Sequence, residues 1–262
     1  MRYASLLILF LSISVSTYCQ KQFVLNSAYL NSPDTVWIFT PTDYTDNKQM
    51  PVTYLLHGWS GKYWHWDYMI DCQEYADNYN TIIVCPDGLY DSWYINSPLE
   101  EENRYESFFI LDLIPLIEKN YNVNKDSIFI TGLSMGGHGA LYLCSKTPGY
   151  FSKVGSLSGL LDLRNWQNHY GISRVLGLGN NHDNKSVLWS YSVISNIDAI
   201  KSLSGNIIVS CGTEDPFYNI NIEFINQCDS KGLSTVFKSA SGGHNAQYWT
   251  DNVVDHFEFF FR

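Results

Sequence analysis

Positive charge is scarce in this chain. Its 262 residues include 16 Lys and Arg against 26 Asp and Glu, which gives a formal net charge of −10 at pH 7. Such a surface repels nucleic-acid phosphates and anionic lipids, so we expect neither as a partner. No apolar run after the first residues is long enough to cross a bilayer, and we therefore expect no membrane span.

The sequence also lacks repeats, low-complexity tracts and proline-rich linkers that would divide it into several domains. Its cysteines show no metal-binding spacing, and several lie in apolar segments, so buried thiols are the default expectation. One disulfide is compatible with an oxidising compartment, and the sequence alone does not pair its members. The candidates are Cys72, Cys85, Cys144, Cys211 and Cys228.

The first residues have the pattern of a secretory signal peptide. Arg2 provides a basic start, residues 4–11 are apolar, and residues 12–19 turn polar. We expect residues 1–19 to be removed and residues 20–262 to form a single domain that is secreted or periplasmic. Lipid attachment at Cys19 is the less favoured alternative, because it needs a smaller residue than Tyr18 just before the cysteine.

From residue 52 onward, short apolar runs alternate with amphipathic stretches, the pattern of buried parallel strands and covering helices. The runs occupy residues 52–56, 81–85, 127–131, 154–158, 206–211 and 235–239. The amphipathic stretches occupy residues 66–79, 106–120, 135–146, 217–231 and 246–261. This alternation predicts a three-layer α/β sandwich, in which ligands gather at the carboxyl ends of the strands.

Two further strands are expected before this region, at residues 22–30 and 34–39. The short turn between them predicts an antiparallel edge, so the sheet should have eight mostly parallel strands. Residues 160–205 are irregular, apart from a short helix expected at residues 191–203. We interpret this segment as an insertion over the functional site.

The most informative motif is Gly132-Leu133-Ser134-Met135-Gly136, which joins an expected strand to an expected helix. A serine in this context is typical of a nucleophile elbow, whose glycines allow strand and helix to approach closely. Ser134 is therefore the candidate nucleophile. The backbone N–H of Met135, at the positive end of the helix, is a candidate oxyanion-hole donor.

A serine hydroxyl needs a base and an orienting carboxylate to act as a nucleophile. In this fold type the chain order is serine, acid, histidine, and His244 in a glycine-flanked loop after the last strand is the candidate base. Asp215 is favoured over Glu214 as the acid, because it is shorter and precedes Pro216. Both carboxylates have an alternative role as caps of the next helix.

The loop that begins at His57 is expected to provide a second oxyanion-hole donor, the backbone N–H of Trp59. Aromatic side chains in the loops after the strands are candidates for substrate contact, because aromatic faces stack on sugars and phenolic acids. These candidates are Trp64, Trp93 and Tyr94, and packing in the core would explain them equally well.

Six segments of the chain resemble the esterase D-like family of α/β hydrolases. They are Leu55–Gly58, Cys85–Gly88, Gly132–Leu141, Ser158–Gly159, Cys211–Asp215, and Gly243–Asn245 with Tyr248 and Trp249. The family includes carbohydrate esterase family 1 feruloyl and acetylxylan esterases, tributyrin esterases and S-formylglutathione hydrolases. The resemblance implies an α/β-hydrolase fold, a Ser134-Asp215-His244 triad, an oxyanion hole formed by Trp59 and Met135, and no metal or organic cofactor.

The leader and residues 91–94 resemble the secreted esterases that act on polysaccharides. We therefore expect a serine carboxylic-ester hydrolase that releases feruloyl, acetyl or similar groups from small or polysaccharide-linked esters. The alternatives are a thioesterase resembling S-formylglutathione hydrolase, which is usually cytosolic, and an acyltransferase resembling the mycolyltransferases. A binding module without catalysis is disfavoured, because all three triad residues are present.

Overall fold

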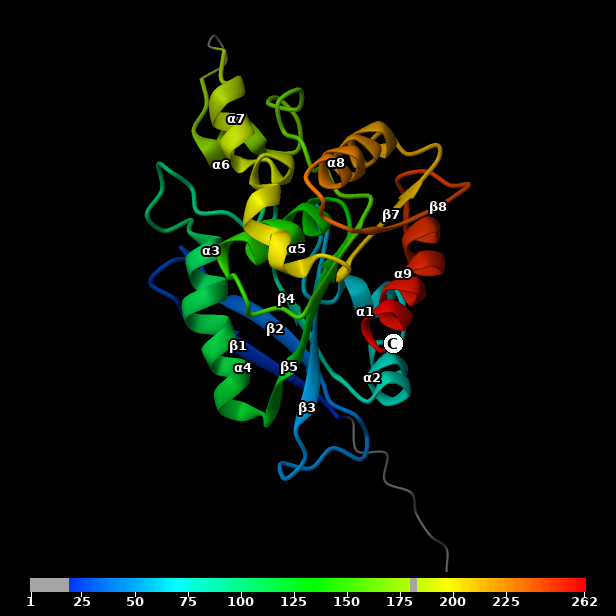
Figure 1. Ribbon diagram of the computed structural model, residues 1–262. Coiled ribbons are helices and arrows are strands. Elements are labelled where there is room, and N and C mark those ends of the chain that lie inside the picture. Colours follow the sequence, from blue (N-terminus) through cyan, green and yellow to red (C-terminus); the bar gives the residue numbers. More distant parts are fainter. Residues whose placement is uncertain (1–18, 180–182) are drawn as a thin grey trace, which may run out of the picture.

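A central sheet of eight strands, in the order β1-β2-β4-β3-β5-β6-β7-β8, organises the computed structural model, which describes residues 19–179 and 183–262 (Figure 1). The strands are β1 (Gln20–Leu25), β2 (Asp34–Phe39), β3 (Met50–Leu56), β4 (Ile82–Pro86), β5 (Val123–Gly132), β6 (Lys153–Leu157), β7 (Ile207–Gly212) and β8 (Val236–Ala240).

The pairing of the strands confirms the predicted sheet. β1 pairs antiparallel with β2, and β2 pairs antiparallel with β4. From β4 to β8 every neighbouring pair is parallel. The carboxyl ends of β3 to β8 therefore meet at one edge of the sheet, and the loops that follow them form one surface.

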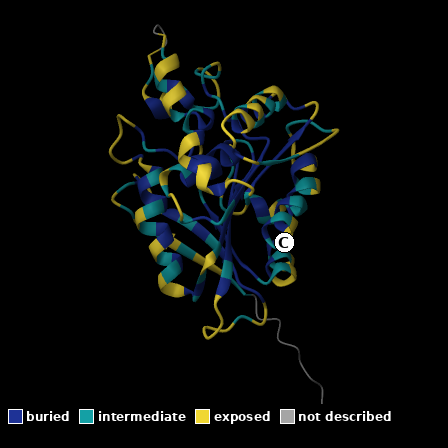
Figure 2. Ribbon diagram, in the orientation of Figure 1, coloured by how far each residue is buried: buried dark blue, intermediate teal, exposed yellow. Residues whose placement is uncertain are grey.

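Helices cover both faces of the sheet, as expected for the α/β-hydrolase fold. One face packs against α1 (His65–Met69), α2 (Cys72–Tyr79) and α9 (Ala246–Phe260), and the other against α4 (Ile114–Asn120), α5 (Met135–Lys146) and α8 (Tyr218–Ser230). Figure 2 shows the consequence: the middle strands, such as β3, β4 and β7, are buried between the layers, whereas the edge strands β1 and β8, the loops and the outer sides of the helices carry exposed residues.

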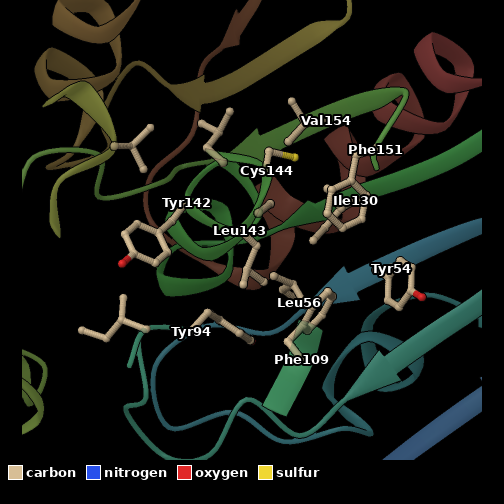
Figure 3. Close-up of a cluster of buried hydrophobic side chains, with 14 of the residues drawn as sticks. Tyr54, Leu56, Tyr94, Phe109, Ile130, Tyr142, Leu143, Cys144, Phe151 and Val154 are labelled. Carbon is tan, nitrogen blue, oxygen red and sulfur yellow. The ribbon is translucent and has the colours of Figure 1, made fainter. Parts of the chain in front are cut away.

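The two cores follow from the alternation of side chains along the strands. In β4, Ile82 and Val84 point to one core, whereas Ile83 and Cys85 point to the other. The larger core lies between α5 and the middle strands, where Leu143 packs near Leu56 and Ile130 (Figure 3). It holds α5, and with it the turn that carries Ser134, firmly against the sheet.

Two of the predicted helices are interrupted. The helix expected at residues 66–79 is divided into α1 and α2, because Asp71 accepts a hydrogen bond from Glu74 N (2.9 Å) and thus caps a new helix. The helix expected at residues 106–120 runs through α3 (Tyr105–Phe108), a π-helical turn η1 (Phe109–Leu113) and α4. Pro115, in the first turn of α4, has no N–H with which to continue a regular α-helix.

Residues 160–205 contain α6 (Ile172–Leu176), α7 (Lys185–Tyr191) and the 3₁₀ segment η2 (Val193–Leu203). The last corresponds to the helix expected at residues 191–203. Residues 1–18, which make up nearly all of the predicted signal peptide, lie outside the described residues. In the described part of the chain, no helix has both the length and the apolar character needed to cross a membrane.

Candidate active site

Ser134 occupies the sharp turn between β5 and α5. Its backbone adopts φ 55° and ψ −115°, a conformation that side-chain-bearing residues rarely take. The flanking glycines permit the turn: a Cβ on Gly132 would lie 2.5 Å from the carbonyl oxygen of Gly136, and one on Gly136 would overlap the carbonyl oxygen of Leu56. The strain and the tight packing are those of a nucleophile elbow.

Ser134, His244 and Asp215 form one hydrogen-bonded line. His244 Nε2 lies 2.8 Å from Ser134 Oγ, and His244 Nδ1 lies 2.8 Å from Asp215 Oδ2. Because an ionised carboxylate only accepts, Nδ1 carries the proton and Nε2 accepts from the serine hydroxyl. The structure therefore brings together the three residues that the sequence assigned to a triad, from the loops after β5, β7 and β8.

The surroundings of the imidazole hold it in place. The Asp215 side chain is fully buried, and its second oxygen accepts a hydrogen bond from Phe217 N (2.8 Å). The rings of Phe217 and Trp249 flank His244 at centroid distances of 4.6 and 4.9 Å. The carboxylate and the ring thus have little freedom to separate.

Glu214, the other carboxylate considered for the acid, is used differently. It accepts hydrogen bonds from the backbone N–H of Gly242 and from the hydroxyl of Thr213 (2.9 Å), and these bonds lower the pKa of the Glu214 carboxyl. Gly242 O in turn accepts from Glu214 N (3.0 Å). Glu214 therefore fastens the loop that carries His244 and does not touch the imidazole.

Two backbone amides near Ser134, those predicted for the oxyanion hole, have no hydrogen-bond acceptor among the described residues. Within residues 19–179 and 183–262, neither Trp59 N nor Met135 N donates a hydrogen bond to a protein acceptor. Met135 N is the first amide of α5. Gly58 lies so close to the elbow that a Cβ on it would be 3.4 Å from Ser134 Cβ, and this places the adjoining Trp59 amide beside the serine.

The peptide between Gly58 and Trp59 is fixed by its carbonyl group. Gly58 O accepts from Gly61 N (3.0 Å) and lies 2.7 Å from His57 Nδ1. Gly88 N donates to His57 Nε2 (2.6 Å), so the imidazole proton is on Nδ1 and donates to Gly58 O. Because the C=O and N–H of a trans peptide point in opposite directions, these bonds also orient the Trp59 N–H.

A cavity of about 130 Å³ opens at Ser134. Its walls include side chains that the sequence analysis did not assign to the site, namely His65, Leu133, Tyr170 and Trp249, together with the predicted Trp59 and His244. Tyr170 comes from the irregular segment and packs against the Trp59 ring at 5.6 Å. Burial is the main cause that lowers the pKa of His65, and this favours the neutral form of its imidazole.

The predicted substrate contacts of Trp93 and Tyr94 are wrong. Both are buried, with 1% and 0% exposure, and both have positive φ angles. The Trp93 indole donates to Tyr170 O (2.9 Å), and the Tyr94 hydroxyl donates to His57 O (2.8 Å). They support the walls of the site from behind.

Trp64 is exposed but does not line the cavity; its ring contacts His65 and Tyr68.

No group of three or more potential metal ligands occurs in the part of the chain that the structure describes. The five cysteines considered above are buried free thiols: Cys72, Cys85, Cys144, Cys211 and Cys228.

Comparison with known proteins agrees with this geometry. The model of the family described as "Putative esterase" matches residues 27–260. The chain belongs to this esterase family. It is 26% identical over 257 residues to an acetyl esterase of Caldicellulosiruptor saccharolyticus, with 88% of this chain and 94% of the relative aligned.

Two other relatives of the esterase carry different names. An S-formylglutathione hydrolase of Rattus norvegicus is 25% identical over 271 residues, covering 90% of this chain and 93% of the relative. A solved structure of a ferulic acid esterase superposes with a TM-score of 0.77 at 25% identity, covering 94% and 99% of the two chains. The esterase described here is thus a carboxylic ester hydrolase of the serine hydrolase type.

Proposed function

We propose that this esterase is exported and removes short acyl groups, acetyl foremost, from carbohydrate esters through an acyl-enzyme on Ser134. The observation that carries the proposal is the hydrogen-bonded line of Ser134, His244 and Asp215 beside two unengaged backbone amides. The basic and apolar pattern of residues 1–19 supports export.

The geometry supports a two-step reaction. His244 Nε2 accepts the Ser134 proton as Oγ attacks the ester carbonyl, and Asp215 stabilises the imidazolium that forms. The amides of Trp59 and Met135 donate to the developing oxyanion. His244 then protonates the departing alcohol. A water molecule, deprotonated by the same imidazole, then attacks the acyl-enzyme; the acid is released as the imidazolium returns this proton to Ser134 Oγ.

The size of the cavity supports a small acyl group. Its volume of about 130 Å³ is well below the roughly 300 Å³ at which pockets for drug-sized ligands begin. An acetyl group is small enough for this volume, whereas a feruloyl group is much larger. A relative named acetyl esterase agrees with this choice. A long mycolyl chain exceeds this volume many times over.

A second candidate is hydrolysis of S-formylglutathione. Formyl is smaller still than acetyl, and a relative with similar coverage carries that name. The predicted leader argues against it, because the hydrolases of that kind are usually cytosolic. The two candidates share the nucleophile and differ in the group that leaves.

Turnover of a substrate panel by the wild type and two serine variants tests the proposal. The panel contains para-nitrophenyl acetate, acetylated xylan, methyl ferulate and S-formylglutathione, compared by kcat/KM. We expect the two acetyl esters to be preferred and Ser134→Ala to lose about 10⁴-fold or more in kcat. Ser190→Ala, on the exposed side of α7, is the matched control.

Two results would contradict the proposal. Wild-type rates that persist in Ser134→Ala would exclude the nucleophile. A higher kcat/KM for S-formylglutathione than for either acetyl ester would favour the second candidate, and a preference for methyl ferulate would show that the cavity does not limit the acyl group.

A further inference from the structure

A second cavity, of about 290 Å³, lies beside the cavity at Ser134. Its walls come from three places in the chain: the turn before β2 with Ser32, the loop after β3 with Lys62 and Tyr63, and the loop after β4 with Asp87 and Tyr90. None of these residues takes part in the proposed acyl transfer.

The sheet order sets the distance between the two cavities. The strands β2, β4, β3 and β5 are neighbours in this order, and Ser134 follows β5. With neighbouring strands roughly 4.8 Å apart, a cavity centred on the end of β4 lies about 10 Å from the serine. A molecule bound in both cavities would therefore need more than one sugar ring beyond its acyl group.

The partition between the cavities is a pair of aromatic rings. Trp59, which lines the cavity at Ser134, contacts Tyr90 at a centroid distance of 5.1 Å, and Tyr90 lines the second cavity. The backbone joins the two loops as well, because Ser60 N donates to Tyr90 O (2.7 Å). The two cavities therefore share one wall.

The second cavity combines aromatic faces with both signs of charge. Tyr90 is 59% exposed, and Tyr63 is half-buried with its edge against Trp37. Asp87 Oδ1 accepts from Leu89 N (3.0 Å), whereas Oδ2 accepts no hydrogen bond from any described residue. Lys62 forms no ion pair within the described ranges.

These groups decide what kind of molecule the cavity suits. A lipid tail would leave Asp87 and Lys62 facing hydrocarbon, which is costly. An anion would be repelled by Asp87. A neutral sugar offers hydroxyl groups that donate to the free Asp87 oxygen and accept from Lys62, while its ring packs on an aromatic face.

We propose that this cavity binds a neutral glycosyl residue of the alcohol part of the ester, next to the acylated sugar at Ser134. The inference rests on the proposed function and extends it, because it states that the substrate is an acylated oligosaccharide or polysaccharide chain. The enzyme then distinguishes a sugar ester from a simple ester by contacts beyond the reacting bond.

The test compares two acetyl esters that differ only in the alcohol part: acetylated xylotriose and para-nitrophenyl acetate. Two variants alter the second cavity in different ways. Ser32→Trp fills it from an exposed turn, and Tyr63→Ala removes an aromatic face. Tyr68→Ala, 81% exposed and outside both cavities, is the matched control.

We expect the ratio of kcat/KM for acetylated xylotriose to that for para-nitrophenyl acetate to fall about tenfold in both variants, mainly through KM. Tyr68→Ala should keep the wild-type ratio. Thermal melting shows whether each variant is folded.

An unchanged ratio in folded Ser32→Trp and Tyr63→Ala, with para-nitrophenyl acetate still hydrolysed, would overturn the sugar site and leave the esterase proposal standing. A wild type that hydrolyses neither ester would overturn the esterase proposal and the sugar site with it.

Discussion

His57 acts on the proposed oxyanion hole through the peptide group that follows it. Its Nδ1–H donates to Gly58 O, and its Nε2 accepts from Gly88 N, so one buried ring ties the loop after β3 to the loop after β4. A hydrogen bond to a peptide carbonyl also polarises the N–H of the same peptide, here the amide of Trp59. His57 is thus a positioning residue that does not touch the substrate.

Replacement of His57 by alanine should lower kcat more than it changes KM. The Trp59 amide would lose its fixed orientation, and complete loss of one such donor costs about 3–4 kcal/mol of transition-state stabilisation. We expect kcat for para-nitrophenyl acetate to fall by about 10- to 100-fold, measured alongside the melting temperature. A rise in KM at unchanged kcat would show that His57 does not act through the oxyanion hole.

The site residues that could be predicted from the sequence are those whose role is indicated by the residues next to them in the sequence. Ser134 lies between a strand and a helix with glycines on both sides, and His244 follows the last strand. Trp93 and Tyr94 differ, because their burial depends on hydrogen bonds to carbonyl groups of distant residues, Tyr170 and His57, which the adjoining sequence does not indicate. Tyr170 carries no such local signal; it reaches the cavity because Trp93 holds its carbonyl group.

The turn between β5 and α5 is possible only because the helix lies directly on the sheet. Gly136, in the first turn of α5, packs against the end of β3 and the start of the loop that follows. A Cβ on Gly136 would overlap Leu56 O and lie 2.6 Å from His57 O. These contacts are with backbone atoms, which a side-chain rotation cannot relieve. The helix would have to move away from β3.

Gly136→Ala should therefore reduce both stability and activity. Overpacking of this kind costs about 1–3 kcal/mol, and a shift of α5 would also displace the Met135 amide. We expect a lower melting temperature and a lower kcat for para-nitrophenyl acetate. Ser145→Ala, in the last turn of the same helix, should change neither. A Gly136→Ala protein with wild-type stability would show that the helix can adapt.

The alternation of apolar runs and amphipathic stretches was sufficient to predict the strands and the layers, because each element buries one side against its neighbours. It could not predict where a helix is interrupted. Asp71 and Pro115 are present in the sequence, but tertiary packing decides whether the helix is interrupted at these residues. The irregular segment at residues 160–205 has even less local signal, since η2 is stabilised by its contacts with α5.

Buried histidines make the stability of the protein depend on pH. His256 in α9 lies over β6 and contacts the strands on both sides of it, with Nδ1 2.8 Å from Thr131 Oγ1 in β5 and Nε2 2.9 Å from Ser210 Oγ in β7. Burial lowers the pKa of His256 to about 3. On the opposite face, burial likewise lowers the pKa of His138 in α5 to about 4, and His138 Nε2 donates to Tyr191 O (2.9 Å).

These shifts fix the sign of the pH dependence. An unfolded chain binds protons at its histidines near pH 6.5, whereas the folded protein keeps these two neutral until pH 4 or below. The free energy of unfolding should therefore fall as the pH drops from 6.5 toward 4. Asp34 acts in the opposite sense, since burial, followed by the charge of Asp87, raises the pKa of its carboxyl.

Urea unfolding between pH 7.5 and 4.5 measures how the free energy of unfolding changes with pH, and so the net effect of the histidines and of Asp34. Each histidine contributes up to about 1.4 kcal/mol per pH unit, so replacement of both by glutamine should flatten the acid slope even though it also lowers stability at pH 7.5. His169→Gln, at an exposed position in the irregular segment, is the control and should keep the wild-type slope. If the double variant loses stability with acid as steeply as the wild type, carboxylates and not these histidines cause the acid sensitivity, because only the histidines differ between the two proteins.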